Sequence, residues 1–156
     1  MKFRHHSWEL EFRKPFGALP IGSAVTLRVY ATEIEKLKLR TCFNDQEILH
    51  PMIKSRESNF WEVTLDMPVI PGILWYDFSF CSRNRAYAYG TLHDHLGGEG
   101  RIYETKPPSY QITVYDPKRQ SPAWYSQGIM YQIFPDRFAA SSRVHKPGPL
   151  EPWEAP

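Results

Sequence analysis

The stretch GILWYDFSF, residues 72–80, alternates between two kinds of side chain. Every second residue is large and apolar, and polar residues stand among those between them. Since successive side chains of a strand point to opposite faces, this period of two predicts a strand that buries one face. The face expected to be buried holds Leu74, Tyr76, Phe78 and Phe80, and the outer face holds Trp75, Asp77 and Ser79.

The same alternation recurs along the chain, in residues 6–12, 23–31, 36–43, 59–67, 86–92 and 109–116. Proline and glycine, which favour turns, separate several of these runs. Short strands roughly a dozen residues apart, with no helical period between them, are typical of two-sheet folds. The sequence therefore predicts an all-β fold, an immunoglobulin-like antiparallel β-sandwich over residues 1–116.

The alternation also assigns faces to individual side chains. Trp8 and Trp61 are expected on inward faces, where they would fill the core. Lys36, Lys38 and Arg40 share the other face of their strand, a pattern typical of a solvated sheet edge that discourages further pairing.

Composition excludes several classes of protein. The 156 residues carry 19 basic and 17 acidic side chains, interspersed, without the concentrated basic face of a nucleic-acid binder. No apolar run approaches the roughly 20 residues of a membrane span, and the first ten residues lack the apolar segment of a signal peptide. We therefore expect no membrane partner and a cytoplasmic location. In that compartment Cys42 and Cys81 are expected to be buried reduced thiols, with a disulfide as the alternative.

The pattern changes after Asp116. Residues 117–126 are expected to be a linker, and GIMYQIF, residues 128–134, is an uninterrupted apolar run. Such a run is typical of a strand buried on both faces, as in a parallel sheet or a barrel. We expect residues 127–156 to be the start of a second domain, of which the chain holds only this first strand.

The segment PAWYSQGIMYQIFPDRF, residues 122–138, resembles the start of the (β/α)8 barrel in α-amylase-family glycoside hydrolases. The residues that carry the match, with a structural role implied for them, are Tyr131, Gln132, Pro135, Asp136, Arg137 and Phe138. Residues 11–22, 75–80 and 97–115 resemble the N-terminal domain of the neopullulanase, cyclomaltodextrinase, maltogenic amylase and pullulanase-like branch.

This resemblance implies a parent enzyme that hydrolyses α-1,4 and α-1,6 bonds of α-glucans with a pair of carboxylates. Those carboxylates lie on later barrel strands, at the C-terminal face of the barrel. No catalytic residue is therefore assigned in this chain, and the chain alone is expected to be inactive. No cofactor is expected, and residues 139–148 lack the carboxylates and amides of the calcium loop found in several relatives.

Carbohydrate binding is the function that exposed aromatic residues suggest. An outward Trp75 flanked by Asp77 would stack on a glucose ring and accept from its hydroxyls. Tyr87 and Tyr89 share a face before a glycine-rich loop and are further candidates. For all of these, packing under a loop, in the core or against a barrel is the alternative.

Two roles remain open for such a domain, glucan binding or contact with the protein's own barrel or a second subunit, as in a homodimer. A single outward tryptophan favours the contact role, since a polysaccharide platform needs a row of rings. A free-standing immunoglobulin-like scaffold or carbohydrate-binding domain is a further alternative.

The loop from Leu92 to Gly100 shows two other patterns. His93, Asp94 and His95 suggest a metal site, but no third ligand has a fixed spacing, so we expect a solvated polar surface. The glycines of residues 97–100 lack the lysine and helix of a phosphate loop, so a turn is expected.

Overall fold

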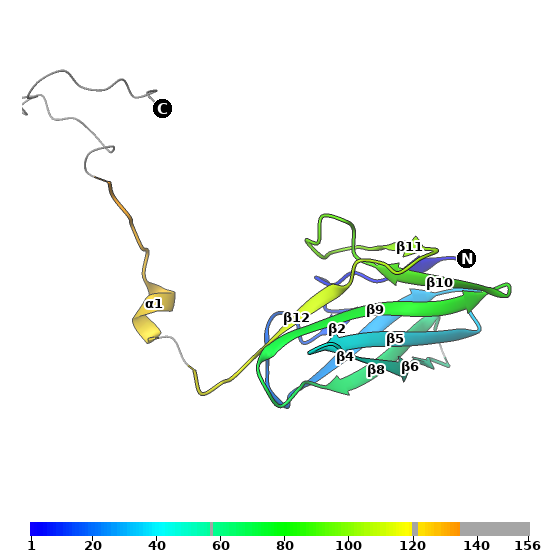
Figure 1. Ribbon diagram of the computed structural model, residues 1–156, viewed down its shortest axis with the longest axis horizontal. Coiled ribbons are helices and arrows are strands. Elements are labelled where there is room, and N and C mark those ends of the chain that lie inside the picture. The colour runs from blue at the N-terminus through cyan, green and yellow to red at the C-terminus, as the bar shows by residue number, and fades with distance from the viewer. Residues whose placement is uncertain (57, 120–121, 135–156) are drawn as a thin grey trace, which may run out of the picture. The chain divides into compact units, whose positions relative to one another are not determined.

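A computed structural model describes residues 1–56, 58–119 and 122–134 (Figure 1). The chain forms two compact units, Met1–Gln120 and Ser121–Pro156, which are described separately. We call the first the sandwich unit. The predicted domain boundaries at residues 116 and 126 stay predictions.

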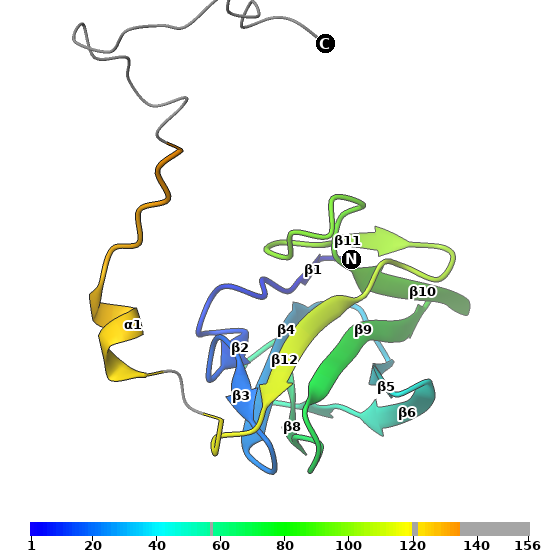
Figure 2. The ribbon, with the colours of Figure 1, turned by 60° about the vertical axis from the view of Figure 1, so that its left-hand side comes forward.

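Two sheets build the described part of the sandwich unit, and they lie face to face in Figures 1 and 2. The five-stranded sheet consists of β1 (Phe3–Arg4), β2 (Arg13–Lys14), β4 (Ala24–Ala31), β7 (Ile53–Lys54) and β8 (Phe60–Asp66). The seven-stranded sheet consists of β3 (Leu19–Pro20), β5 (Lys36–Phe43), β6 (Gln46–Pro51), β9 (Gly72–Ser82), β10 (Arg85–Gly90), β11 (Arg101–Tyr103) and β12 (Tyr110–Tyr115). Neighbouring strands are antiparallel except β3 and β12, which are parallel. The all-β prediction is confirmed, and the two layers agree with the predicted sandwich.

Strand β9 organises the larger sheet. It pairs with β5 along one edge and with both β12 and β10 along the other. Two-residue turns, Asn44–Asp45 and Arg83–Asn84, join β5 to β6 and β9 to β10, and all four turn residues have positive φ angles. Such turns match the twist of the strands that they connect.

The core lies between the two sheets. Its side chains come from the inward faces that the alternation predicts on β4, β5, β9 and β12, together with Trp61 of β8. Core residues of these four strands include Val25, Leu27, Val29, Leu37, Leu39, Leu74, Tyr76, Phe78, Phe80, Ile112 and Val114.

The sequence interpretation of residues 36–40 as a sheet edge is wrong. β5 lies between β6 and β9, so it is an inner strand. The pattern missed β6 because both of its faces are exposed, including Ile48 and Leu49, and no alternation marks a buried side.

Both cysteines are free thiols, but the expectation that both are buried is wrong, since Cys42 is only partly buried and Cys81 is exposed. On the ladder between β5 and β9, Cys42 lies opposite Trp75, whereas Cys81 lies opposite Lys36. At about 3.4 Å per residue, this places the two cysteines roughly 20 Å apart along the strands, far beyond disulfide reach.

In the second unit, α1 (Ala123–Gln127) is a single short helix that begins inside the segment expected to be a linker and ends at the first residue of the expected second domain. Residues 128–134 pair with no described residue, and Ile129 is 83% exposed. The barrel strand is not seen and stays a prediction. No helix in the described residues has the length and apolar character needed to cross a membrane.

Candidate functional site

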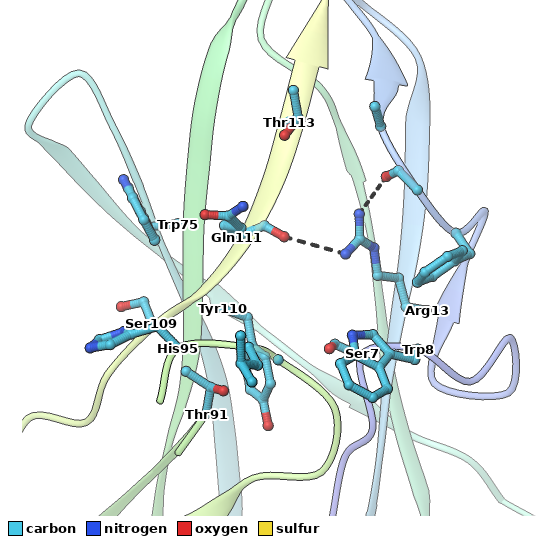
Figure 3. A pocket seen from close by; sticks show the side chains of 15 residues that line it. Ser7, Trp8, Arg13, Trp75, Thr91, His95, Ser109, Tyr110, Gln111 and Thr113 are labelled. Atoms are coloured by element: carbon cyan, nitrogen blue, oxygen red, sulfur yellow. Dashed lines mark hydrogen bonds between the residues drawn. The ribbon is translucent and has the colours of Figure 1, made fainter. Parts of the chain in front are cut away.

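A pocket of about 220 Å³ opens on the outer face of the larger sheet, where β9 and β12 run side by side (Figure 3). We call it the tryptophan pocket. The N-terminal segment supplies Trp8 and Arg13, β9 supplies Trp75, and β12 supplies Gln111. The loop after β10 closes another side with Thr91 and His95. Figure 3 shows Trp75 on one side of the pocket and Arg13 and Trp8 on the other.

Trp75 lies on the outer face of β9, as the alternation predicts, and it is 38% exposed. In the ladder its neighbours are Cys42 on β5 and Gln111 on β12. Both neighbours are small or polar, so part of the indole stays accessible from the pocket. Its predicted role as a sugar-contacting ring stays a prediction.

Trp8 contradicts the sequence interpretation. It was expected to fill the core, but it is 56% exposed and lines the pocket. The reason is that residues 6–12 form no strand. They make a single bridge, from His6 to Glu99, and then turn, with the amide nitrogens of Phe12 and Arg13 donating to the carbonyl of Glu9.

The glycine-rich loop holds Trp8 in place. The amide of Ser7 donates to the carbonyl of Gly98 at 3.0 Å, and the amide of Gly98 donates to the Ser7 hydroxyl at 2.9 Å. A Cβ atom on Gly97 would lie 3.0 Å from that hydroxyl and 3.1 Å from the Trp8 Nε1. Glycine at this position, with a φ of +84°, therefore lets the loop approach the indole. The loop predicted as a plain turn is thus also the support of an aromatic ring.

Arg13 forms the polar wall of the pocket. The side chain is almost covered, with 6% of the residue exposed. Its Nη2 donates to the carbonyl of Gly17 at 2.6 Å, and its Nη1 donates to the carbonyl of Gln111 at 3.3 Å (Figure 3). Burial lowers the pKa of the Arg13 guanidinium.

His5 anchors the segment that carries Trp8 and Arg13. The ring is fully buried. Its Nδ1 donates to the carbonyl of Arg28 at 2.8 Å, and its Nε2 accepts from the Tyr76 hydroxyl at 3.1 Å. Burial lowers the pKa of His5 to about 3, so the ring is neutral at neutral pH. Tyr76 in turn stacks on Tyr110 of the pocket, with 5.1 Å between ring centroids.

Asp77 differs from the expectation that it flanks Trp75 as a free acceptor. Its position is on the outer face, but its side chain is only 3% exposed because Arg40 lies over it. Arg40 Nε donates to the carboxylate at 3.0 Å, and the Ser109 hydroxyl donates to it at 2.8 Å. Arg40 also pairs with the exposed Glu47. The Asp77 oxygens are therefore used within the protein.

The tyrosine pair does not join the site either. Tyr89 is buried, and its hydroxyl donates to the His5 carbonyl at 3.1 Å. Tyr87 stacks on Phe80, with centroids 5.6 Å apart. Neither lines the tryptophan pocket, and both serve the packing alternative given above.

The remaining predicted residues lie elsewhere. Tyr131 and Gln132 belong to the second unit and are exposed, and residues 135–138 (Pro135, Asp136, Arg137 and Phe138) lie outside the described residues. His93 packs edge-on against Tyr103, and Asp94 accepts from the amide of Leu96. Among the described residues no three potential metal ligands come together.

Comparison with known proteins identifies the fold and the family. The family of carbohydrate-binding module 48, the isoamylase N-terminal domain, matches residues 15–117. The chain belongs to this family. The predicted resemblance to the N-terminal domain of α-amylase-family enzymes is thereby confirmed.

Two relatives of this module are amylopullulanases. The protein of Thermoanaerobacter thermohydrosulfuricus is 36% identical over 145 residues, which cover 86% of this chain and 10% of that protein. The protein of Thermoanaerobacterium thermosulfurigenes is 34% identical over 144 residues, which cover 86% of this chain and 8% of that protein. The chain thus spans about a tenth of the length of the curated relatives that it matches.

A solved cyclomaltodextrinase has the same fold. The superposition has a TM-score of 0.53 at 19% identity and covers 93% of this chain and 25% of that chain. At this identity the likeness shows the fold alone.

Proposed function

We propose that this module binds α-glucan chains in the tryptophan pocket, as an accessory domain of an α-glucan hydrolase of the amylopullulanase type. The observation that carries the proposal is the pairing of Trp8 and Trp75 in one pocket. The sequence interpretation found one outward tryptophan, Trp75, and this argued against binding. The structure adds a second exposed indole, that of Trp8.

The chemistry of the lining suits a sugar. Indole rings offer flat apolar faces to the C–H face of a pyranose, and short polar side chains satisfy its hydroxyls. Gln111 and Thr113 supply such groups beside Trp75. Because the glycine loop and the ladder hold both tryptophans, little ordering is needed when a ligand binds.

Affinity electrophoresis in gels that contain soluble starch tests the proposal. The chain should be retarded, and Trp8→Ala and Trp75→Ala should each weaken binding about fivefold, since one stacking contact contributes about 1 kcal/mol. Trp124→Ala is the matched control, because Trp124 is exposed and lies in the second unit. Equal retardation of all three variants would show that starch does not bind in the tryptophan pocket.

The proposal extends to the parent protein. We place α-1,4 and α-1,6 hydrolysis in a catalytic barrel outside this chain, with the cytoplasm as its compartment, which the two free thiols support. The isolated chain should release no reducing sugar from maltodextrin, cyclodextrin or pullulan. Turnover by the pure chain would contradict this division of labour.

A second role, contact with the protein's own barrel or a second subunit, is supported by an apolar end of the sandwich unit. Val69 and Ile70 in the turn before β9 are exposed, as are Ile73 and Tyr115 on β9 and β12. Such exposed apolar groups are common where proteins meet. Light scattering of the chain with and without Val69→Lys tests for a dimer, which the substitution should dissociate; a monomer in both samples would exclude a homodimer through this end.

A further inference from the structure

Arg13 is a buried cation without a counter-ion. Within the described residues, no ion pair involves Arg13. Its guanidinium donates to two backbone carbonyls and lies over the Phe16 ring, 5.7 Å from the ring centroid. The other well-covered arginine, Arg40, is paired with Asp77 and Glu47. Covering a charge is costly unless an opposite charge offsets the lost hydration. Arg13 therefore lacks the carboxylate partner that Arg40 has.

Unpartnered polar atoms gather around the same pocket. In the described part of the chain, four buried side-chain polar atoms have no hydrogen-bond partner. Three of them belong to lining residues of the tryptophan pocket: Arg13 Nε, Thr91 Oγ1 and the Tyr110 hydroxyl. The fourth is Trp61 Nε1 in the core. Buried polar groups are normally paired, so such a group often marks a place where an ion, water or ligand binds.

The charge of the lining has one sign. Of the 15 lining residues none is aspartate or glutamate, whereas Arg13 and His95 are bases. Ser7 and Thr113 add hydroxyl donors. Arg13 Nε and Thr91 Oγ1 also carry or can offer a hydrogen, whereas the Tyr110 side chain belongs to the core. A ligand group that only accepts hydrogen bonds, and is negative, fits such a set.

We propose that the tryptophan pocket binds a phosphate ester carried on a glucose unit of an α-glucan, with Arg13 as the contact for the phosphate. This rests on the glucan binding proposed above and deepens it, since it names a phosphorylated glucan as the preferred ligand. The planar guanidinium is the side chain best suited to phosphate, and the tetrahedral group has enough oxygens to meet several donors at once. The tryptophans hold the neutral sugars on either side.

The test titrates the 156-residue chain, by calorimetry at low ionic strength, with maltoheptaose, phosphorylated maltoheptaose and inorganic phosphate. The phosphorylated sugar should bind at least about tenfold tighter than the neutral one, as expected for hydrogen bonds to a charged group. Added salt should reduce this difference in affinity. Inorganic phosphate should compete with the phosphorylated sugar and not with the neutral sugar. These arms separate free phosphate from the sugar ester as the ligand.

The outcomes are distinguishable. Equal affinity for the neutral and phosphorylated sugars overturns the phosphate inference and leaves the glucan proposal standing. Binding of neither sugar overturns both. Binding of inorganic phosphate without either sugar refutes the sugar ester and the glucan proposal together.

Variants locate the contact. Arg13→Gln should abolish the advantage of the phosphorylated sugar, whereas Arg83→Gln, on an 86% exposed side chain in the hairpin after β9, should keep it. If Arg13→Gln fails to fold, Thr91→Val takes its place, because it removes an unpartnered hydroxyl without removing a hydrogen bond of that group. It should lower the preference for the phosphorylated sugar while leaving the melting temperature unchanged or higher; an unchanged preference refutes the inference.

Discussion

Acid should destabilise the sandwich unit through His5. The ring is buried and neutral, held by the carbonyl of Arg28 and the hydroxyl of Tyr76. A protonated ring could not accept from Tyr76 and would place a charge in the core. The folded protein therefore resists protonation at a pH where the unfolded chain accepts a proton freely.

The magnitude follows from the pKa of His5, which burial lowers from an ordinary value of 6.5 to about 3. Above pH 6.5 the ring is neutral in both states, and its contribution to stability is fully present. As the pH falls from 6.5 towards 3, only the unfolded chain gains the proton, so the free energy of unfolding decreases by about 1.4 kcal/mol per pH unit. The total loss by pH 3 is about 4–5 kcal/mol, comparable with the whole stability of a marginal domain.

Urea unfolding between pH 7.5 and 4 measures this slope, and His5→Phe isolates it from the carboxylates that also titrate. Phenylalanine keeps the aromatic packing against Phe12 and Tyr110 but leaves Tyr76 without its acceptor. The variant should be less stable at pH 7.5 by roughly 1–3 kcal/mol, and the gap to the unsubstituted protein should close as the pH falls. His93→Gln, on an exposed ring, should keep the full slope. A gap that stays constant with pH would refute a neutral buried His5.

Three further predictions follow from single contacts. Asp77→Asn should destabilise the protein by about 3 kcal/mol in urea unfolding because it breaks a covered ion pair. Glu62→Gln, in an exposed pair with Arg28, should destabilise it by less than about 1 kcal/mol. Similar losses for the two variants would contradict the difference in burial. Gly97→Ala should weaken starch retardation by displacing Trp8, whereas Gly22→Ala, also at positive φ but with open space around the new Cβ, should not; equal binding of the two would show that the loop does not hold the indole. A reducing agent should leave the melting temperature unchanged, since Cys42 and Cys81 are free, and a decrease would reveal a disulfide.

The alternation of side chains predicted the long strands because each buries one face. On β4, Val25, Leu27 and Val29 are all buried, and on β9 Tyr76 and Phe78 are. In a strand that buries one face, apolar and polar residues alternate, so the sequence shows which side chains point to the core. The sequence of β6 shows no such alternation, since neither face of the strand is covered. Only its pairing with β5 shows that it is a strand.

Trp8 shows where periodicity misleads. The apolar residues Trp8, Leu10 and Phe12 alternate as in a strand, but only Phe12 is buried. Long-range contacts decide this segment, since His5 is tied to Tyr76 and Ser7 to Gly98. In the sequence, the adjacent glycines Gly97 and Gly98 were the available signal that another group approaches closely there. Both have positive φ angles in the structure.

Asp77 shows a different limit. The alternation gave its face correctly but could not tell that the face is covered at that point. Arg40 lies directly opposite Asp77 in the ladder, and opposite charges at such positions attract. Knowing that β5 and β9 pair, and in which register, would have predicted the ion pair. The sequence alone determines neither the pairing of these strands nor its register.

Family membership does not by itself supply the proposed binding site. The family match covers residues 15–117, so Trp75, Thr91 and Gln111 fall inside it, whereas Trp8 and Arg13 precede it. Three of the 15 residues that line the tryptophan pocket, Ser7, Trp8 and Arg13, therefore belong to the N-terminal segment that His5 anchors to the core. Ligand preference should follow that segment, because it brings both the second indole and the buried cation. A member of the family with another N-terminal segment would keep the sandwich and lose the pocket.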